Sequence, residues 1–322
     1  MTTADLLGKI LQVVMGLAVF AAIIGLLIFL MNRAPKKGRD YWQLSLFLAP
    51  VVFLLAIGLV WPAIRTTGLA FLNNAGEFTW DNFVWMFTQP AAIRTLVNTV
   101  VWVLLVPTLS TALGLAYAVF IDKARGERYY KALVFMPMAI SFVGAGIIWR
   151  FVYEYNSAGQ EQIGLLNAFV VLFGGQPVQW MQTDPINTVL LIVVMIWIQT
   201  GFSMVVLSAA IKGIPAEQIE AAQLDGTNPW QRFMNVTVPG IRGALVVVLT
   251  TISIATLKVF DIVRTMTGGN FNTSVVANEM YVQAFRASEI GRGSALAVIL
   301  FVLVLPIVIY NVNVLRQQRE IR

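Results

Sequence analysis

Apolar residues gather into seven stretches along the chain, each long enough to cross a bilayer as a helix. About 30 Å of hydrocarbon requires roughly 20 mostly apolar residues in an α-helix. Proline residues inside such stretches are tolerated when membrane helices are bundled. The expected spans are Leu6–Met31, Leu44–Ile64, Leu96–Ile121, Ala132–Trp149, Thr188–Ile211, Gly240–Val263 and Ala295–Val314. The pattern predicts an all-α membrane protein with about seven transmembrane helices.

Composition supports a membrane protein and excludes several kinds of chemistry. Of 322 residues, 58% are hydrophobic and 12% are charged, which leaves too few charges for a water-soluble surface. The apolar excess therefore predicts contact with membrane lipid. The chain has no cysteine and no histidine, so disulfides, thiolate metal sites, a cysteine nucleophile and the commonest general base are excluded. No metal site is expected.

The basic residues predict the orientation of the spans rather than a nucleic-acid surface. Lys and Arg concentrate in short cytoplasmic connections of membrane proteins. Fourteen of the 22 basic residues fall on one side of the expected spans, seven fall on the other, and Lys258 lies inside a span. The richer side holds Arg33, Lys36, Lys37, Arg39, Lys123, Arg125, Arg128, Lys131, Lys212, Arg232, Arg242, Arg316, Arg319 and Arg322. This distribution predicts an external N-terminus and a cytoplasmic C-terminus, as an odd number of spans requires.

Two connections on the opposite side are long, around residues 65–94 and 150–187. They carry Trp80, Trp85 and Trp180 among Gly, Asn and Pro turn residues. Tryptophans at these positions are typical of the interfacial aromatic belt, and contact with an external partner is the alternative. The first span and its basic linker, Asn32–Tyr41, are expected to be an addition to a six-span unit.

The connection between the fifth and sixth spans contains a short helical pattern. Pro215 suits the first helical position, and Glu217 and Glu220 favour the positive N-terminal end of a helix. Ala221 and Ala222 leave one face small, and Gly226 is a suitable C-cap. A helix of about ten residues is marginal alone, so docking onto another surface is expected to stabilise it.

This connection resembles the cytoplasmic loop of the integral permeases of binding-protein-dependent ABC importers. That family carries Glu-Ala-Ala, then Gly after three residues, and an Ile-x-Leu-Pro end after nine more. The chain reads Glu220-Ala221-Ala222, Gly226 and Val236-Thr237-Val238-Pro239, with Val in place of Ile and of Leu. The resemblance implies that residues 213–239 form the coupling loop, with Glu220, Ala221, Ala222, Asp225, Gly226 and Pro239 at the ATPase contact.

Other segments resemble sugar-importer permeases in particular. These are Phe260-Asp261 with Thr267-Gly268-Gly269, the last span from Ser294 to Phe301, and Asn98-Thr99 at the start of the core. The added N-terminal span is similar to that of the maltose and α-glucoside branch, as the larger of two paired permeases. The implied organisation is an extra span with its linker (1–43), a first core span with an external loop (44–92), a permease core (93–315) and a cytoplasmic tail (316–322).

The resemblance also implies partners. The chain has no Gly-x4-Gly-Lys-Ser/Thr phosphate loop, so ATP and magnesium would be bound by separate ATPase subunits, which form a dimer in this family. A second permease subunit would contact the other half of that dimer, and an external sugar-binding protein would deliver the substrate. The expected location is the cytoplasmic (inner) membrane of a bacterium or archaeon. The chain itself is expected to have no enzymatic activity and no cofactor.

In maltose-type permeases, stretches of the fifth and sixth spans line the sugar site. We transferred these positions to this chain by counting residues from the loop motif. The resulting candidates for the substrate path are Gln199, Phe202, Ile252, Ala255, Thr256 and Val259. Several of these are apolar where a sugar requires donors and acceptors, and helix packing is the alternative role for each.

Lys258 and Asp261 are three residues apart, which predicts one helix face and an intramembrane ion pair or a polar patch at the outer mouth. A proton relay is the alternative. A secondary transporter driven by an ion gradient is the competing function, but no matched pair of interrupted spans is evident in the sequence. A membrane-embedded enzyme is a third class, with little chemistry to assign.

Overall fold

The computed structural model describes residues 3–33, 38–122, 124–157 and 159–320, and almost all of its regular structure is helical. Lys36, Lys37, Lys123 and Arg322, which contribute to the charge count, lie outside the described residues. The chain divides into two compact units, residues 1–66 and 67–322, which are described separately.

The first unit contains α1 (Thr3–Asn32) and α2 (Arg39–Leu55), with a π-helical turn at Ala56–Val60 that leads into α3 (Trp61–Leu69). From Arg39 to Leu69 the helix is continuous and apolar enough to form one span. Among the side chains described there up to residue 66, none is buried. Such helices are apolar all round and need another apolar environment, which lipid or a partner helix supplies.

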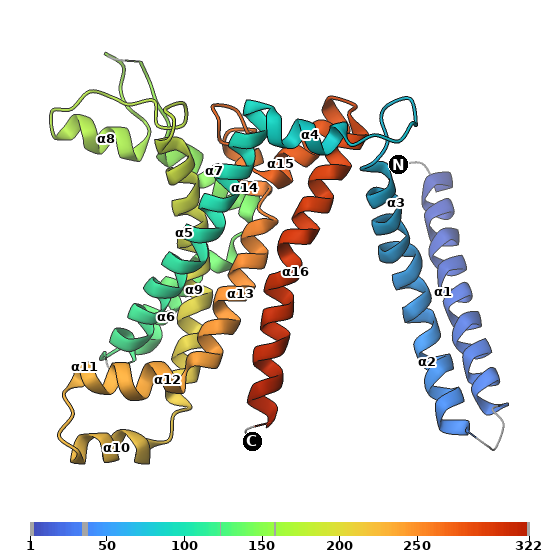
Figure 1. Cartoon of the computed structure of the whole chain (residues 1–322), viewed down its shortest axis with the longest axis horizontal. Helices are drawn as coiled ribbons and strands as arrows, with labels where there is room; N and C mark the ends of the chain where they lie inside the picture. Colours follow the sequence, from blue (N-terminus) through green and yellow to red (C-terminus); the bar gives the residue numbers. More distant parts are fainter. Residues whose placement is uncertain (1–2, 34–37, 123, 158, 321–322) are drawn as a thin grey trace. The chain divides into compact units, whose positions relative to one another are not determined.

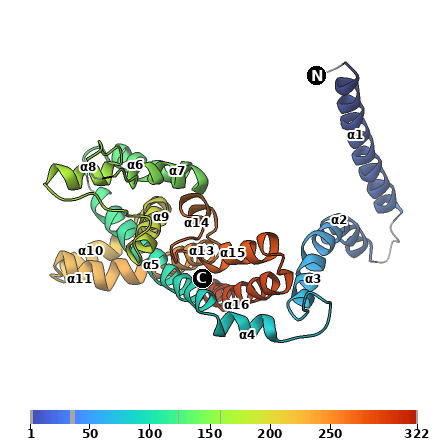
Figure 2. The ribbon, with the colours of Figure 1, turned by 90° about the horizontal axis from the view of Figure 1, so that it is seen from above.

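The second unit is a bundle built around α5 (Pro90–Ile121) and α9 (Ile186–Lys212), which contact each other along their lengths (Figures 1 and 2). α13 (Arg242–Leu257) packs against both of them, and α16 (Ile290–Glu320) packs against α13. Shorter helices complete the bundle: α4 (Asp81–Thr88), α6 (Glu127–Phe135), α7 (Phe142–Val152), α8 (Leu165–Leu172), α10 (Ala216–Leu224), α11 (Pro229–Arg232), α12 (Val238–Gly240), α14 (Asp261–Met266) and α15 (Val276–Tyr281).

Small residues bring the central helices close together. A Cβ at Gly201 on α9 would lie 2.7 Å from the carbonyl oxygen of Val134, which lies on α6. The core around this contact is apolar, with Trp102, Leu191, Met195 and Ile252 fully buried. Small residues at helix interfaces let membrane helices pack by close van der Waals contact, which is the main attraction available to them in lipid.

Within the described ranges, five helices are long and apolar enough to be spans, and two bent pairs raise that number to seven if each pair is one span. The expected span Ala132–Trp149 is bent by 101° between α6 and α7. Pro137 lies in a 3-10 turn at Met136–Ala139, and Ser141 then caps α7 by accepting a hydrogen bond from Gly144 N at 3.1 Å. The expected span is therefore formed by two helices with a sharp bend between them.

The expected span Gly240–Val263 is also interrupted. α13 ends at Leu257, and α14 begins a new short helix at Asp261. A second bend, of 67°, separates α13 from the segment Pro229–Gly240 that precedes it. Two of the expected spans are therefore interrupted.

α10, α11 and α12 lie at one end of the second unit, together with the end of α16 (Figure 1). α8, α4, α15 and the loops beside them lie at the opposite end (Figure 1). The two ends therefore carry different structures, a helical loop at one and irregular connections at the other.

Candidate functional site

The coupling loop, residues 213–239, begins with α10 and projects from the bundle. α10 ends at Leu224, and Gly226 follows with φ +75°, the left-handed conformation expected of a helix C-terminus. Ala222 is buried, and the hydroxyl and amide of Thr227 both donate to its carbonyl oxygen. Glu220 and Leu224 are exposed, and Leu224 retains 90% of its accessible surface.

The return segment of the coupling loop has its own cap. Asn228 and Gln231 exchange two hydrogen bonds, of 2.9 and 2.8 Å, in a capping box at the start of α11. The Trp230 ring lies 5.7 Å from the Phe233 ring, and Trp230 is exposed within this chain. The loop is therefore an ordered element whose outer surface is free in the chain alone.

The two ends of the coupling loop meet at its base. A Cβ at Gly240 would lie 3.2 Å from Ile214 Cδ1. Of the remaining motif residues, Ala221, Asp225 and Pro239 are exposed. The structure thus places five of the six motif residues on α10 or directly after it, with Ala222 buried, and Pro239 on α12 at the base of the loop.

A charged cluster that the sequence did not reveal lies beside this base. Lys131 on α6 forms ion pairs with Asp122 and Glu127, and Lys212 at the end of α9 pairs with Glu127. Ser208 on α9 donates to Asp122 and accepts from Lys131. The only local signal was the i,i+4 spacing of Glu127 and Lys131. The cluster ties α6 to the helix that leads directly into the coupling loop.

The six substrate-path candidates divide by burial. Ile252 and Thr256 on α13 are fully buried, and Val259 is nearly so, which places all three in the packing of this chain. Thr256 donates its hydroxyl to Ile252 O at 2.7 Å. Within the described part of this chain, these three side chains present little or no surface to a ligand.

The other three candidates, Gln199, Phe202 and Ala255, are partly exposed. Phe202 and Ala255 also pack against the apolar core. Within the described ranges of the chain, no residue forms a hydrogen bond with the Gln199 side chain. Gln199 thus has the polar capacity that a ligand in the pathway would require, and it remains a candidate.

Lys258 and Asp261 do not share a helix face. Lys258 follows the last residue of α13, Val259 and Phe260 are non-helical, and Asp261 begins α14. Within the described part of the chain, no ion pair joins Lys258 and Asp261. The predicted pair on one helix face was therefore wrong because the helix is interrupted between them.

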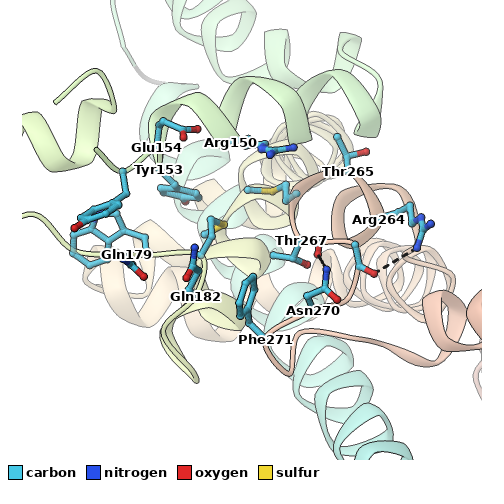
Figure 3. A pocket seen from close by; sticks show the side chains of 15 residues that line it. Arg150, Tyr153, Glu154, Gln179, Gln182, Arg264, Thr265, Thr267, Asn270 and Phe271 are labelled. Atoms are coloured by element: carbon cyan, nitrogen blue, oxygen red, sulfur yellow. Dashed lines mark hydrogen bonds between the residues drawn. The ribbon is translucent and has the colours of Figure 1, made fainter. Parts of the chain in front are cut away.

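A cavity of about 420 Å³ is lined in part by the connection that leads into the N-terminal end of α9, whereas the coupling loop follows the other end of that helix. Figure 3 shows the cavity from close by. We call it the distal pocket. Three segments form it: the end of α7, the connection that precedes α9, and α14 with the loop after it. Its walls include Arg150, Tyr153, Glu154, Gln179, Trp180, Gln182, Arg264, Thr265, Thr267, Asn270 and Phe271. Two sequence features coincide with this site: the long connection with its Trp180, and Thr267-Gly268 of the segment that resembles sugar-importer permeases.

Buried hydrogen bonds fix one wall of the distal pocket. Asn167 on α8 is fully buried and donates to Glu154 O and Val178 O, both at 3.0 Å. Its Oδ1 accepts from Val178 N at 2.9 Å and from Trp180 Nε1 at 2.8 Å. Burial raises the pKa of the Tyr153 phenol, so its hydroxyl remains protonated and donates to Leu190 O at 3.3 Å.

The chain matches the sequence profile of the family "binding-protein-dependent transport system inner membrane component" over residues 92–321. It is 47% identical over 271 residues to the alpha-glucoside transport system permease protein AglF of Rhizobium meliloti, covering 83% of this chain and 81% of that one. It is 46% identical over 279 residues to the osmoprotective compounds uptake permease protein GgtC of Synechocystis sp., covering 86% of this chain and 100% of that one.

The fold is similar to that of a chain in the crystal structure of a bacterial ABC transporter that imports the acidic polysaccharide alginate. The TM-score is 0.75 at 23% sequence identity, covering 88% of this chain and 98% of the other. At that identity the likeness concerns the fold alone. Together with the coupling loop at the end of the bundle, the family match shows that this chain belongs to the inner membrane components of binding-protein-dependent transport systems.

Proposed function

We propose that this chain is the larger of two paired permease subunits of an ATP-driven importer, and that it forms half of the pathway for an α-glucoside such as maltose or trehalose. The main support for coupling to an ATPase is α10, which protrudes from the bundle with Glu220 and Leu224 exposed on it. An exposed apolar side chain beside a carboxylate on a short capped helix is suited to docking into a groove of a partner.

The substrate part is supported by the relatives. AglF, at 47% identity, is named for α-glucoside transport, and a permease of Thermococcus litoralis at 31% identity over 216 residues is named for trehalose and maltose. A neutral sugar is bound through hydrogen bonds to its hydroxyl groups, which require donors and acceptors and no strong charge. The amide of Gln199 would provide both in the proposed pathway.

The partners follow from the same arrangement. A dimeric ATPase would bind ATP and magnesium and receive the coupling loops of this chain and of a second permease. Closure of the dimer would move α10, and α9 and α13 would transmit that motion to the bundle because they flank the loop. An external binding protein would deliver the sugar at the end that carries the distal pocket, with the N-terminus outside and the C-terminus in the cytoplasm.

The test is uptake of labelled maltose and trehalose into proteoliposomes that contain this chain with its permease partner, ATPase and binding protein. Uptake should require ATP on the ATPase side and should not respond to an imposed proton or sodium gradient. Uptake that is driven by an ion gradient without ATP would establish the secondary-transporter alternative, which the interrupted helices alone do not exclude.

A further inference from the structure

We propose that the distal pocket is a second saccharide site, which binds one neutral pyranose ring of the arriving sugar before the ring enters the pathway between the permeases. This proposal rests on the proposed sugar import. The pocket lies at the N-terminal end of α9, and Gln199 lies further along the same helix. The cavity of about 420 Å³ is within the range of roughly 300–1,000 Å³ that is typical of small-molecule sites.

Unused polar groups surround the cavity. The amides of Gln179 and Gln182, the guanidinium of Arg150 and the carboxylate of Glu154 line it, and no residue in the described ranges hydrogen-bonds any of these four side chains. Two amides offer donors and acceptors at once, as vicinal sugar hydroxyls require. Arg150, Gln179 and Gln182 are exposed and Glu154 is half-buried, so these side chains are free to bind a ligand that enters the cavity.

Aromatic rings complete the set. Phe271 lines the pocket with 48% of its surface accessible (Figure 3). Trp180 also lines the pocket, and its indole nitrogen donates to Asn167 Oδ1 at 2.8 Å. An aromatic face is suited to the apolar C–H face of a pyranose, so the rings and the amides together match both surfaces of a sugar ring.

The charges of the cavity nearly balance. Arg264 also lines it, and its guanidinium lies 4.9 Å above the Tyr281 ring and donates to Gly268 O at 3.5 Å. With Arg150 and Glu154, the charged side chains of the lining carry a formal net charge of +1. A site for a strongly anionic ligand would present a larger excess of positive charge.

The backbone of the loop after α14 is held in an unfavourable conformation. Phe271 and Asn272 adopt φ angles of +55° and +62°, in the left-handed region that L-residues with large side chains rarely occupy. Buried amides from two spans hold this turn: Asn187 donates to Phe271 O at 2.8 Å, and Asn98 donates to Asn272 O at 2.6 Å. Strain that is retained by dedicated buried contacts is typical of functional sites, and here it presents the Phe271 ring to the cavity.

The absence of cysteine from the chain allows a direct test. Thr265→Cys places a single thiol of similar size on the pocket wall, and Gln176→Cys places one on the exposed connection outside it. Maleimide labelling of each variant is measured on this chain in the assembled transporter without binding protein. Maltose should slow labelling of Thr265→Cys along a binding curve, by about tenfold when its free concentration exceeds the dissociation constant about tenfold. Gln176→Cys should react at an unchanged rate.

Two further labelling experiments test which groups bind the sugar. Adding Gln179→Ala and Gln182→Ala to Thr265→Cys should raise the maltose concentration for half-protection about threefold or more, since hydrogen bonds to the hydroxyls are lost. Mannitol, an acyclic polyol without a ring face, should not protect. Labelling that is unaffected by maltose and trehalose, or protection by mannitol equal to that by maltose, would overturn the proposal.

If another protein covers the distal pocket, the labelling experiment gives results that differ from sugar binding. A Thr265→Cys thiol that reacts in the isolated chain but not in the complex would show that a partner subunit fills the pocket. Weakened association of the sugar-free binding protein in the two glutamine variants, without sugar protection, would make the pocket a protein-docking surface. Both results overturn the saccharide site. ATP-driven uptake of maltose without protection rejects this site alone, whereas protection without any α-glucoside uptake rejects the proposed import and supports the site.

Discussion

Gly114 on α5 faces Ser203 on α9 so closely that a Cβ at position 114 would lie 2.3 Å from Ser203 Cβ. The backbone of Met204 is also within 2.8 Å of that position, so a shift of one side chain would not relieve the contact. These two helices form the centre of the bundle, and α9 continues into the coupling loop. The glycine therefore sets the distance between the two helices that connect the ends of the unit.

Gly114→Ala should reduce the stability of the assembled protein. Overpacking a close-packed contact costs about 1–3 kcal/mol, and here backbone atoms must move. The measurement is the temperature at which detergent-solubilised protein loses its monodisperse elution. Gly16→Ala, on α1 where an added Cβ meets nothing within 4 Å, is the matched control and should be neutral. Equal melting of Gly114→Ala and wild type would show that the helices can separate freely.

Glu220→Lys should leave the chain inserted in the membrane but separate it from its ATPase. Glu220 is exposed on α10 without an ion pair among the described residues, so the reversed charge would disturb the partner groove and not this chain. Co-purification of the ATPase and ATP-driven uptake should both fall. Glu161→Lys, an equivalent reversal on the opposite end of the unit, should alter neither. Normal uptake and normal co-purification of Glu220→Lys would contradict the docking role.

The charge distribution predicts the orientation of the chain. A reporter fused after Arg322 should be cytoplasmic, and one placed before Leu6 should be external. Paired enzymatic reporters, one active only inside and one active only outside, provide the measurement. A cytoplasmic N-terminus would contradict the seven-span topology.

Gln199→Ala should raise the sugar concentration for half-maximal uptake or change the preference among α-glucosides. One hydrogen bond to a neutral hydroxyl contributes ~0.5–1.5 kcal/mol, about two- to tenfold in affinity. Basal ATP hydrolysis by the complex should stay near normal, since the coupling loop is untouched. Gln176→Ala, at an exposed site outside the pathway, is the control. Unchanged affinity and preference with full assembly would remove Gln199 from the site.

Asn167→Ala should loosen the wall of the distal pocket. Its amide makes four hydrogen bonds in a fully buried position, and each buried partner left unpaired costs about 1–3 kcal/mol. Limited proteolysis of the connection between α8 and α9 should accelerate, while Asn313→Ala on the exposed side of α16 should have no such effect. Unaltered proteolysis would mean that other contacts hold this connection.

The sequence by itself determined the membrane class, the approximate positions of the spans and the coupling loop. These properties depend on local patterns: runs of apolar residues, and a helix between Pro215 and Gly226 whose signals lie within a dozen residues. The bend at Ser141 also had local signals, namely Pro137 and a serine cap, although the apolar run concealed them. Hydropathy averages over a span and does not register one interrupted turn.

Only the tertiary structure decided the separation of Lys258 from Asp261, the burial of Ile252 and Thr256, and the existence of the distal pocket. Each depends on contacts between residues far apart in sequence, such as Asn187 with Phe271 and Asn98 with Asn272. A buried amide can satisfy any carbonyl that the fold brings to it, so its own sequence neighbourhood carries no record of the partner. The pocket exists because three distant segments meet at one end of α9, and no local pattern encodes that meeting.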